Sequence, residues 1–302
     1  MKNKILLLIV VVLSVIAISG SKKETTYFNN AKKEEVKEEI KLALKDTLTG
    51  EIKNIELEDY IVGVVAGEMP ASFNEEALKA QAIASRTYAM YKMKNSNGTY
   101  DLVTDKTNQV YITEDKMKKL WQENFDYYFE KIKKAVYDTK DLIMTCNGNV
   151  ILSMYFARSN GKTEDAILVF GSNEEYLKSV ESPEESLISE VTISKDEFCN
   201  KLNISCDAIN ISNVLKSSSG RINSLNINGK TFKGTEIRTL FDLKSTDFDI
   251  SIGSEIKFVT KGYGHGVGMS QYGANKLAQN GKNYEEILKH YYQNINIEKI
   301  SV

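Results

Sequence analysis

The first regular pattern beyond the amino terminus is an alternation of apolar and less apolar residues. Ile40, Leu42 and Leu44 occupy every second position, which predicts a half-buried strand that ends at the turn over residues 47–50. A second short strand is expected over residues 52–55, where two isoleucines flank a polar pair. The chain therefore begins its fold with strands.

The period then changes to that of a helix. Apolar residues at helical spacing are Leu57, Ile61, Val64 and Val65. Pro70 cannot continue a helix, so the helix is expected to stop there and to carry Glu68 on its last turn. Ser72 followed by Glu75 has the spacing of a capping box and predicts the start of a second helix.

Small and aromatic residues mark the following helices. The second helix carries alanines on one face, which allow close packing, and a third is expected roughly over residues 113–137. Its aromatic stripe indicates core packing rather than a ligand platform. Two strand-like segments, 142–144 and 150–156, are joined by the turn residues 147–149 and predict a hairpin. Helices return at residues 270–279 and 284–292.

Residues 187–261 differ in pattern from both flanks. Short apolar alternations are interrupted there by Ser, Asn and Gly clusters, without a long helical pattern after Asn210. Since the candidate chemistry lies on both sides, this segment is interpreted as a β-rich inserted domain. The predicted class is α+β, with a mostly helical catalytic domain (40–186 plus 262–302) that carries a few strands, and the insertion flanks a cleft.

The first 21 residues predict a membrane-directed segment. Lys2 and Lys4 precede an apolar run over residues 5–18, which is short for a full span and fits either a signal-peptide core or a short anchor. We favour an uncleaved anchor with the carboxy-terminal portion outside the cytoplasm. Residues 22–39 are polar and mixed in charge, as expected of a stalk.

Composition and charge exclude several classes of protein. With 39 basic and 41 acidic residues the net charge is −2, which gives no basic field for a nucleic acid partner. The three cysteines form no metal-binding pattern. Cys199 and Cys206 could form a disulfide or remain isolated small hydrophobic residues. We expect no structural role that depends on their oxidation.

Three local patterns are candidates for chemistry. Glu68, at a helix carboxyl end with an apolar flank, is favoured as a neutral acid. The loop 158–163 lacks the spacing of a phosphate-binding loop, so nucleotide binding is rejected. Glycine at alternate positions of 262–268 lets the backbone bend tightly around His265, and a lone histidine in such a run is more often a hydrogen-bonded structural residue than a base.

Four segments of the sequence, which include Glu68 and the glycine-rich run, are similar to those of a known protein family. These segments are Ile61–Pro70, Glu76–Tyr88, Gln109–Tyr111 and Gly264–Ala274. Together they resemble the stage II sporulation protein D family, over about residues 40–292. The resemblance implies a lytic transglycosylase that cuts peptidoglycan glycan strands between N-acetylmuramic acid and N-acetylglucosamine, and that prefers strands already stripped of peptide by an amidase.

Site residues follow from the same resemblance. Glu68 matches the catalytic glutamate of the family. The implied substrate-binding residues are Lys79, Arg86, Ser159, Lys162, His265, Ser270 and Gln271. Arg86 is expected to point toward substrate, because a close pairing with Glu68 would lower the pKa of that acid. Some family members bind zinc through a His and two Cys before the Gln-Val-Tyr motif; residues 95–108 contain neither type, so no metal or other cofactor is expected.

The implied setting is forespore engulfment at the cell membrane. Expected partners are peptidoglycan strands, a cell-wall amidase and membrane proteins of the engulfment machinery. An alternative of another class fits most of the motif: a glycan-binding protein that enhances an amidase without cutting. Digestion of peptide-free strands separates the two, since only the enzyme forms 1,6-anhydromuramic acid ends.

Overall fold

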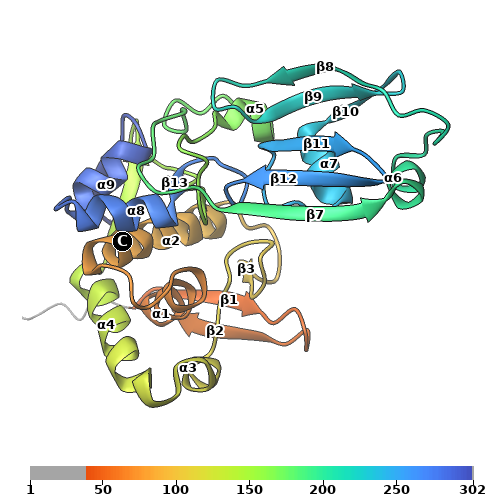
Figure 1. The fold of residues 1–302 in the computed structure, drawn as a ribbon. Helices are drawn as coiled ribbons and strands as arrows, with labels where there is room; N and C mark the ends of the chain where they lie inside the picture. The colour runs from red at the N-terminus through yellow and green to blue at the C-terminus, as the bar shows by residue number, and fades with distance from the viewer. Residues whose placement is uncertain (1–38, 301–302) are drawn as a thin grey trace, which may run out of the picture. The chain divides into compact units, whose positions relative to one another are not determined.

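Helices and strands are mixed along the chain in the structure, a computed structural model that describes residues 39–300 (Figure 1). The predicted α+β class is confirmed. The predicted anchor, residues 1–21, and all of the stalk except Glu39 lie outside the described residues. Within residues 39–300, none of the helices combines the length and apolar character needed to cross a membrane.

The two predicted amino-terminal strands pair with each other. β1 (Lys41–Lys45) lies antiparallel to β2 (Ile52–Glu56) and parallel to β3 (Leu102–Val103). Leu42 and Leu44 are fully buried, as the alternation predicts. The sheet thereby fixes the start of the helix that follows β2.

Two helices form the centre of the larger hydrophobic cluster. α1 (Leu57–Glu68) ends two residues before Pro70 and carries Glu68 on its last turn, as predicted, and α2 (Glu75–Lys94) follows after a short turn. The predicted capping box is wrong, because α2 is capped by Asn74, whose side chain accepts a hydrogen bond from the Glu76 amide. The alanines of α2 are completely buried, which is the close packing expected of them.

The third predicted helix is broken in two. α3 (Glu114–Trp121) and α4 (Phe125–Asp138) are separated by the 3₁₀ turn η1 (Gln122–Asn124). Gln122 has a positive φ of 48°, which a continuous helix does not allow. The aromatic side chains pack across the break, with the rings of Trp121 and Phe125 6.3 Å apart.

The predicted hairpin is present with a short second strand. β4 (Leu142–Cys146) pairs with β5 (Asn149–Val150) around a turn whose Asn147 and Gly148 both have positive φ. The remaining elements on this side are β6 (Tyr155–Phe156), α5 (Ala166–Phe170), β13 (Met269–Ser270), α8 (Gln271–Gln279), α9 (Tyr284–Tyr291) and β14 (Asn296–Lys299). β6 leaves the hairpin and pairs in parallel with β13, which joins two distant parts of the sequence.

The remaining strands all lie within residues 188–261 (Figure 1). One sheet has the order β11-β12-β7 and the other β10-β9-β8. The elements are β7 (Ile188–Ser194), α6 (Lys195–Leu202), β8 (Ile211–Lys216), β9 (Ile222–Ile227), β10 (Lys230–Lys233), α7 (Gly234–Leu240), β11 (Phe248–Ile252) and β12 (Glu255–Lys261). A second hydrophobic cluster, built around Phe198 and Phe258, is drawn from these elements. The division of the chain into domains stays a prediction.

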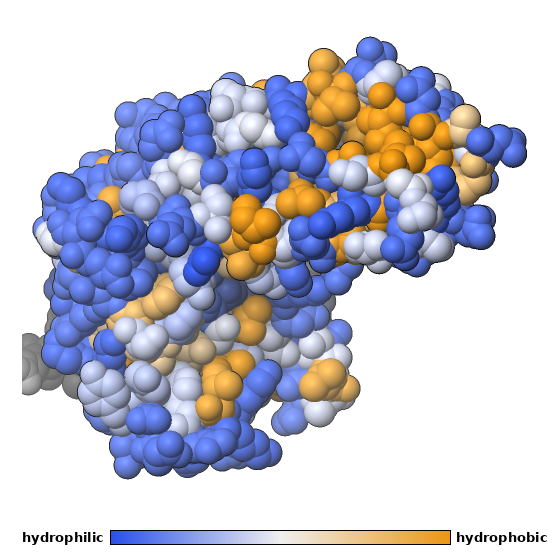
Figure 2. All heavy atoms as spheres, viewed as in Figure 1, coloured by the Kyte–Doolittle hydropathy of each residue, from blue (hydrophilic) through white to orange (hydrophobic). Residues whose placement is uncertain are grey.

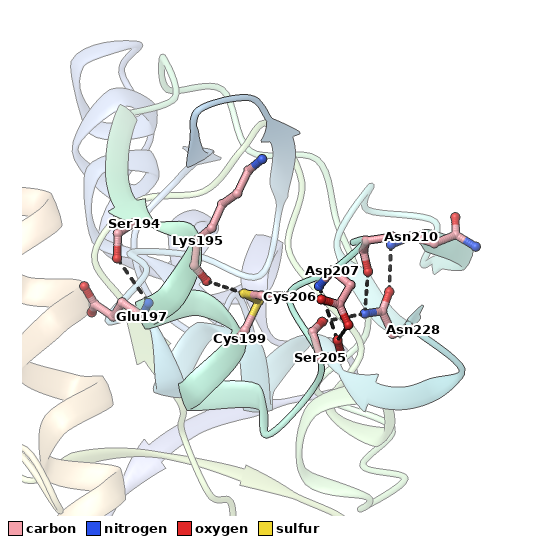
Figure 3. The surroundings of a disulfide bond; sticks show 10 residues. Ser194, Lys195, Glu197, Cys199, Ser205, Cys206, Asp207, Asn210 and Asn228 are labelled. Atoms are coloured by element: carbon pink, nitrogen blue, oxygen red, sulfur yellow. Dashed lines mark hydrogen bonds between the residues drawn. A yellow bond between two sulfur atoms is a disulfide. The ribbon is translucent and has the colours of Figure 1, made fainter.

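A disulfide joins α6 to the loop behind it. Cys199 of α6 is bonded to Cys206 (Figure 3). Ser194 caps the same helix by accepting a hydrogen bond from the Glu197 amide, also drawn in Figure 3. The expectation that no cysteine has an oxidation-dependent structural role is therefore wrong: the bridge fixes the end of a short helix to its connecting loop. Cys146 is a buried free thiol.

Apolar surface gathers over the strand-rich part. Figure 2 shows mostly hydrophilic residues on the face drawn, with apolar ones concentrated over the region of β8 to β11. Val214 and Leu215 of β8 and Ile252 of β11 are among the exposed large apolar residues. β8 is an edge strand with an irregular register, so part of its apolar surface stays uncovered.

Candidate active site

Glu68 occupies the last position of α1, half-buried at the wall of a cavity. Its Oε1 accepts a hydrogen bond of 2.7 Å from the backbone N–H of Val110 and one of 3.4 Å from the Tyr155 hydroxyl. Its Oε2 accepts from the side-chain amide of Gln271 at 3.4 Å. The carboxyl group is thus oriented by three donors from three distant parts of the chain.

Two glycines of α1 explain why Val110 reaches this carboxyl. Gly63 and Gly67 lie one turn apart on the same face. A Cβ on Gly67 would lie 2.3 Å from the Val110 carbonyl oxygen, and one on Gly63 would lie 2.3 Å from the Tyr111 ring. The Gln-Val-Tyr segment therefore packs directly on the helix backbone, which brings the amide of Val110 onto Glu68.

Burial raises the pKa of Glu68 above its ordinary value. The hydrogen bonds from Val110, Gln271 and Tyr155 oppose this shift because they stabilise the ionised form, but burial dominates. The carboxyl end of α1 adds a partial negative charge beside the group, which acts in the same direction as burial. Glu68 is therefore biased toward the neutral acid.

The cavity beside Glu68 has a volume of about 310 Å³. Its wall includes Tyr88, Lys106, Tyr155, Arg238 and His265. Glu68 is the only carboxyl group among the lining residues in the described part of the chain. A reaction that needs two positioned carboxylates thus finds only one here.

A network of buried hydrogen bonds holds the side chains that donate to Glu68. The Tyr155 hydroxyl accepts a hydrogen bond from Gln109 at 2.8 Å, and the other end of that amide accepts from the Tyr60 hydroxyl at 3.1 Å. On the opposite side, the Gln271 amide also contacts Gln81 at 3.4 Å. These side chains are held by partners on both ends, so the donors to Glu68 are fixed before any ligand arrives.

The glycine-rich segment bends as expected. Gly264, Gly266 and Gly268 all have positive φ, and a Cβ on Gly268 would lie 2.0 Å from the Met154 carbonyl oxygen. The close approach forms the parallel pairing of β6 and β13 and so carries Tyr155 to Glu68.

His265 lines the cavity, but its ring is already engaged. Nδ1 accepts a hydrogen bond from the Val267 amide at 3.1 Å, and the ring also bonds the backbone of Tyr155. Burial and then the positive charge of Arg238 lower the pKa of His265 to about 4. The imidazole is therefore neutral at physiological pH. It lines the cavity and, through its hydrogen bonds, holds the neighbouring backbone in place.

Arg86 does not face the cavity, so the expectation that it points toward substrate is wrong. Its guanidinium is fully buried and pairs with Glu58 through two hydrogen bonds, from Nε at 2.8 Å and from Nη2 at 2.5 Å. It also donates to the carbonyl oxygens of Leu142 and Val136. A buried charge requires such partners, and the complete burial of Arg86 keeps its guanidinium out of reach of a glycan.

Lys79 and Lys162, the two lysines predicted to bind substrate, also lie outside the cavity wall. Lys79 forms ion pairs with Glu75, Glu76 and Asp138 on the helix surface. Lys162 has its ammonium 3.6 Å from Glu181, which is itself well exposed. Neither lysine is among the residues that line the Glu68 cavity, and their role in binding the glycan stays a prediction.

Ser159 and Ser270 are structural. Both are completely buried. The Ser159 amide donates to Glu184 at 2.8 Å, and the Ser270 hydroxyl bonds the same carboxylate. Glu184 thus ties the two segments together beneath the surface, and the buried hydroxyls of both serines are not exposed to a ligand, contrary to the sequence-based expectation. Arg158 stacks on the ring of Tyr272, 3.6 Å from its centroid.

Sequence reasoning missed four groups of the site. Tyr155, the amide of Val110, Lys106 and Arg238 all reach Glu68 or its cavity. The Gln-Val-Tyr motif signalled the segment of Val110, whereas Tyr155 and Arg238 lie in short elements without a distinguishing pattern. Within residues 39–300, no group of three or more His, Cys, Asp or Glu side chains is arranged to hold a metal ion.

The chain is similar in sequence to several known proteins. Residues 45–146 match the SpoIID family, described as stage II sporulation protein. The chain is 39% identical over 265 residues to stage II sporulation protein D of Bacillus subtilis, covering 84% of this chain and 77% of that protein. It is also 39% identical over 260 residues to the protein of the same name from Bacillus amyloliquefaciens, covering 82% and 76%. An amidase enhancer of Bacillus subtilis is 30% identical over 292 residues, covering 76% of this chain and 39% of that protein.

Proposed function

This chain belongs to the SpoIID family, and we propose that it is a peptidoglycan lytic transglycosylase that acts in sporulation. Its substrate would be a glycan strand from which the peptide stems have been removed. The bond cut would lie between N-acetylmuramic acid and N-acetylglucosamine, leaving a 1,6-anhydromuramic acid end.

One observation carries this proposal: Glu68 is a half-buried carboxyl group of raised pKa, and no second carboxyl group lines its cavity in the described part of the chain. Ordinary glycosidases need two carboxylates, because one protonates the leaving oxygen while the other activates water or attacks the sugar. A lytic transglycosylase uses the C6 hydroxyl of the sugar itself as the nucleophile. A single acid that later acts as a base is then sufficient.

The proposed reaction balances without water. Neutral Glu68 donates its proton to the glycosidic oxygen as the bond from that oxygen to C1 of N-acetylmuramic acid breaks, which releases N-acetylglucosamine with a free hydroxyl. The resulting carboxylate accepts the proton of the C6 hydroxyl while O6 bonds to C1. Glu68 ends protonated, as it began, and the intramolecular attack gains the effective molarity of a tethered nucleophile, roughly 10⁵ M or more.

The donors around Glu68 suit both stages. Hydrogen bonds from Val110, Tyr155 and Gln271 stabilise the carboxylate that forms after proton transfer, whereas burial favours the acid that must be present before it. Opposed effects of this kind bring the two protonation states closer in energy, which helps a group that must act as acid and then base.

The setting of the reaction is part of the proposal. The relatives named for sporulation support a role in that process, and the amidase enhancer suggests an amidase as a partner. We place the carboxy-terminal portion outside the cytoplasm, with residues 1–21 as a membrane anchor and membrane proteins of engulfment as neighbours. The Cys199–Cys206 disulfide supports this location, because disulfides persist in oxidising compartments.

The alternative function is a glycan-binding enhancer of an amidase that does not cut. The similarity to a protein named amidase enhancer favours it. Digestion of purified peptide-free strands by the wild type, Glu68→Gln and Glu285→Gln separates the two, since Glu285 is an exposed glutamate on α9 that serves as the control. The proposal predicts anhydro ends with the wild type and the control variant only. Strands that bind but stay uncut with every variant would favour the enhancer.

A further inference from the structure

Arg238 is a cation in the wall of the Glu68 cavity that none of the steps above uses. It lies on α7, in the strand-rich part of the chain, and is partly buried. Its Nε donates to the carbonyl oxygen of Leu243 at 3.3 Å. Within residues 39–300, no carboxylate forms an ion pair with its guanidinium.

The surroundings leave this charge undercompensated. Burial lowers the pKa of Arg238, which means that the site penalises the positive charge. Tyr263, in the cavity wall, and then Asp242 offset part of this penalty, and Asp242 lies on the exposed surface outside that wall. In contrast, the buried Arg86 has a bidentate carboxylate partner. A half-buried guanidinium without such a partner is a binding group for an anion.

The cavity as a whole favours the same kind of ligand. Its charged lining groups are Lys106 and Arg238 on the positive side and Glu68 on the negative side. Glu68 is biased toward its neutral form, and His265 is neutral at physiological pH. With the acid protonated, the described wall presents two positive charges and no negative one.

The proposed glycan offers a single kind of anion. N-acetylglucosamine is uncharged, whereas N-acetylmuramic acid carries a lactyl group that ends in a carboxyl. In strands with stems this carboxyl is bound in an amide to the peptide and has no charge. Removal of the stem exposes a free carboxylate, whose planar shape matches the donor fork of a guanidinium.

We propose that Arg238 binds the free lactyl carboxylate of N-acetylmuramic acid and thereby selects peptide-free strands. This inference rests on the proposed function, because it takes the glycan strand as the ligand of the cavity. Selection is then a property of this chain and does not depend on a partner that presents the strand. A stem peptide is rejected because its amide leaves the guanidinium without an anion.

The experiment compares two forms of the same peptide-free strand, one with free lactyl carboxylates and one in which they are capped as methylamides. Cleavage is measured as kcat/KM for the wild type, Arg238→Gln and Lys257→Gln, where Lys257 is a surface cation of β12 that pairs with Glu190. A charge-assisted hydrogen bond predicts about a 10- to 100-fold preference of the wild type for the free carboxylate. Arg238→Gln loses this preference and Lys257→Gln retains it.

Binding provides a readout that does not need turnover. The affinities of both strands are measured for Glu68→Gln and for the double variant Glu68→Gln/Arg238→Gln, with circular dichroism as the check of folding. The single variant is expected to prefer the free carboxylate and the double variant to bind both strands equally. Arg238→Lys retains a charge without the planar fork, and an intermediate preference is expected.

Failure of the two proposals can be told apart. If wild-type protein treats both strands alike, or if Arg238→Gln keeps the full preference, the role of Arg238 is overturned while the cleavage of strands is unaffected. If no variant cuts either strand but the binding preference depends on Arg238, the transglycosylase proposal fails and the carboxylate site remains.

Discussion

Replacing Arg86 with leucine tests the corrected role of the largest fully buried side chain in the described structure. The change leaves Glu58, which is 5% exposed, as a buried carboxylate without its cation. Loss of one partner from a buried ion pair costs about 3–5 kcal/mol in the free energy of unfolding. For a chain of this size the melting temperature should fall by about 10 °C.

The double variant Glu58→Leu/Arg86→Leu isolates the unpaired charge as the cause. It removes both ions and should recover part of the loss, since two apolar side chains can replace a buried pair. Recovery stays incomplete because the carbonyl oxygens of Leu142 and Val136 lose their donor, at about 1–3 kcal/mol for an unsatisfied buried group.

Denaturant unfolding and turnover of the folded protein together decide the outcome. Lys118→Gln breaks an exposed pair with Glu114 and should change stability by less than about 1 kcal/mol, which makes it the control. Arg86→Leu should lose stability while its folded fraction retains kcat. Unchanged stability with abolished cleavage would refute this reasoning and return Arg86 to the substrate site.

The remaining predictions concern the acid and the disulfide. Cleavage needs neutral Glu68, so activity should fall as pH rises through its raised pKa; Gln271→Leu removes a bond that lowers this pKa and should move the alkaline limb of the pH profile to higher pH. A limb that stays in place would contradict this. A carboxyl group with a raised folded-state pKa contributes stability that is present at low pH and lost as pH rises through that pKa, so Glu68→Gln should unfold at higher denaturant than the wild type at neutral pH but not at acidic pH. Tyr155→Phe removes one donor to the carboxylate and should lower kcat about tenfold with little change in KM; an equal loss on strand binding would indicate a different role. Changing Cys199 and Cys206 to alanine should cost about 2–3 kcal/mol in unfolding free energy, whereas unaltered stability under reducing conditions would show that the bridge is dispensable.

Local signals in the sequence predict the position of Glu68 well. The helical period of the preceding residues and the stop at Pro70 depend only on near neighbours, and the helix ends at Glu68 in the structure. The hairpin of β4 and β5 follows for the same reason, since its turn residues favour positive φ.

Long-range contacts explain what the sequence does not predict. Arg86 pairs with Glu58, which is 28 residues away in the sequence. Helical periodicity shows which face of α2 carries Arg86 but not which side chain that face contacts. Tyr155 reaches Glu68 only because the two-residue strand β6 pairs with β13 from the far end of the chain. The positive φ of Gln122 interrupts the helix, although the aromatic residues continue at helical spacing on both sides. The residue types of this segment therefore give no sign of the break.

Cleavage of peptide-free strands in ¹⁸O-labelled water tests the central claim, that a single carboxyl group catalyses an attack by the sugar's own hydroxyl, most directly. If Glu68 alone acts first as acid and then as base, the C6 hydroxyl closes the ring and no oxygen from water enters the new ends. Mass spectrometry should then find anhydro ends without the heavy label. Labelled reducing ends would mean that water attacks the sugar, and would contradict the account of a single carboxyl group.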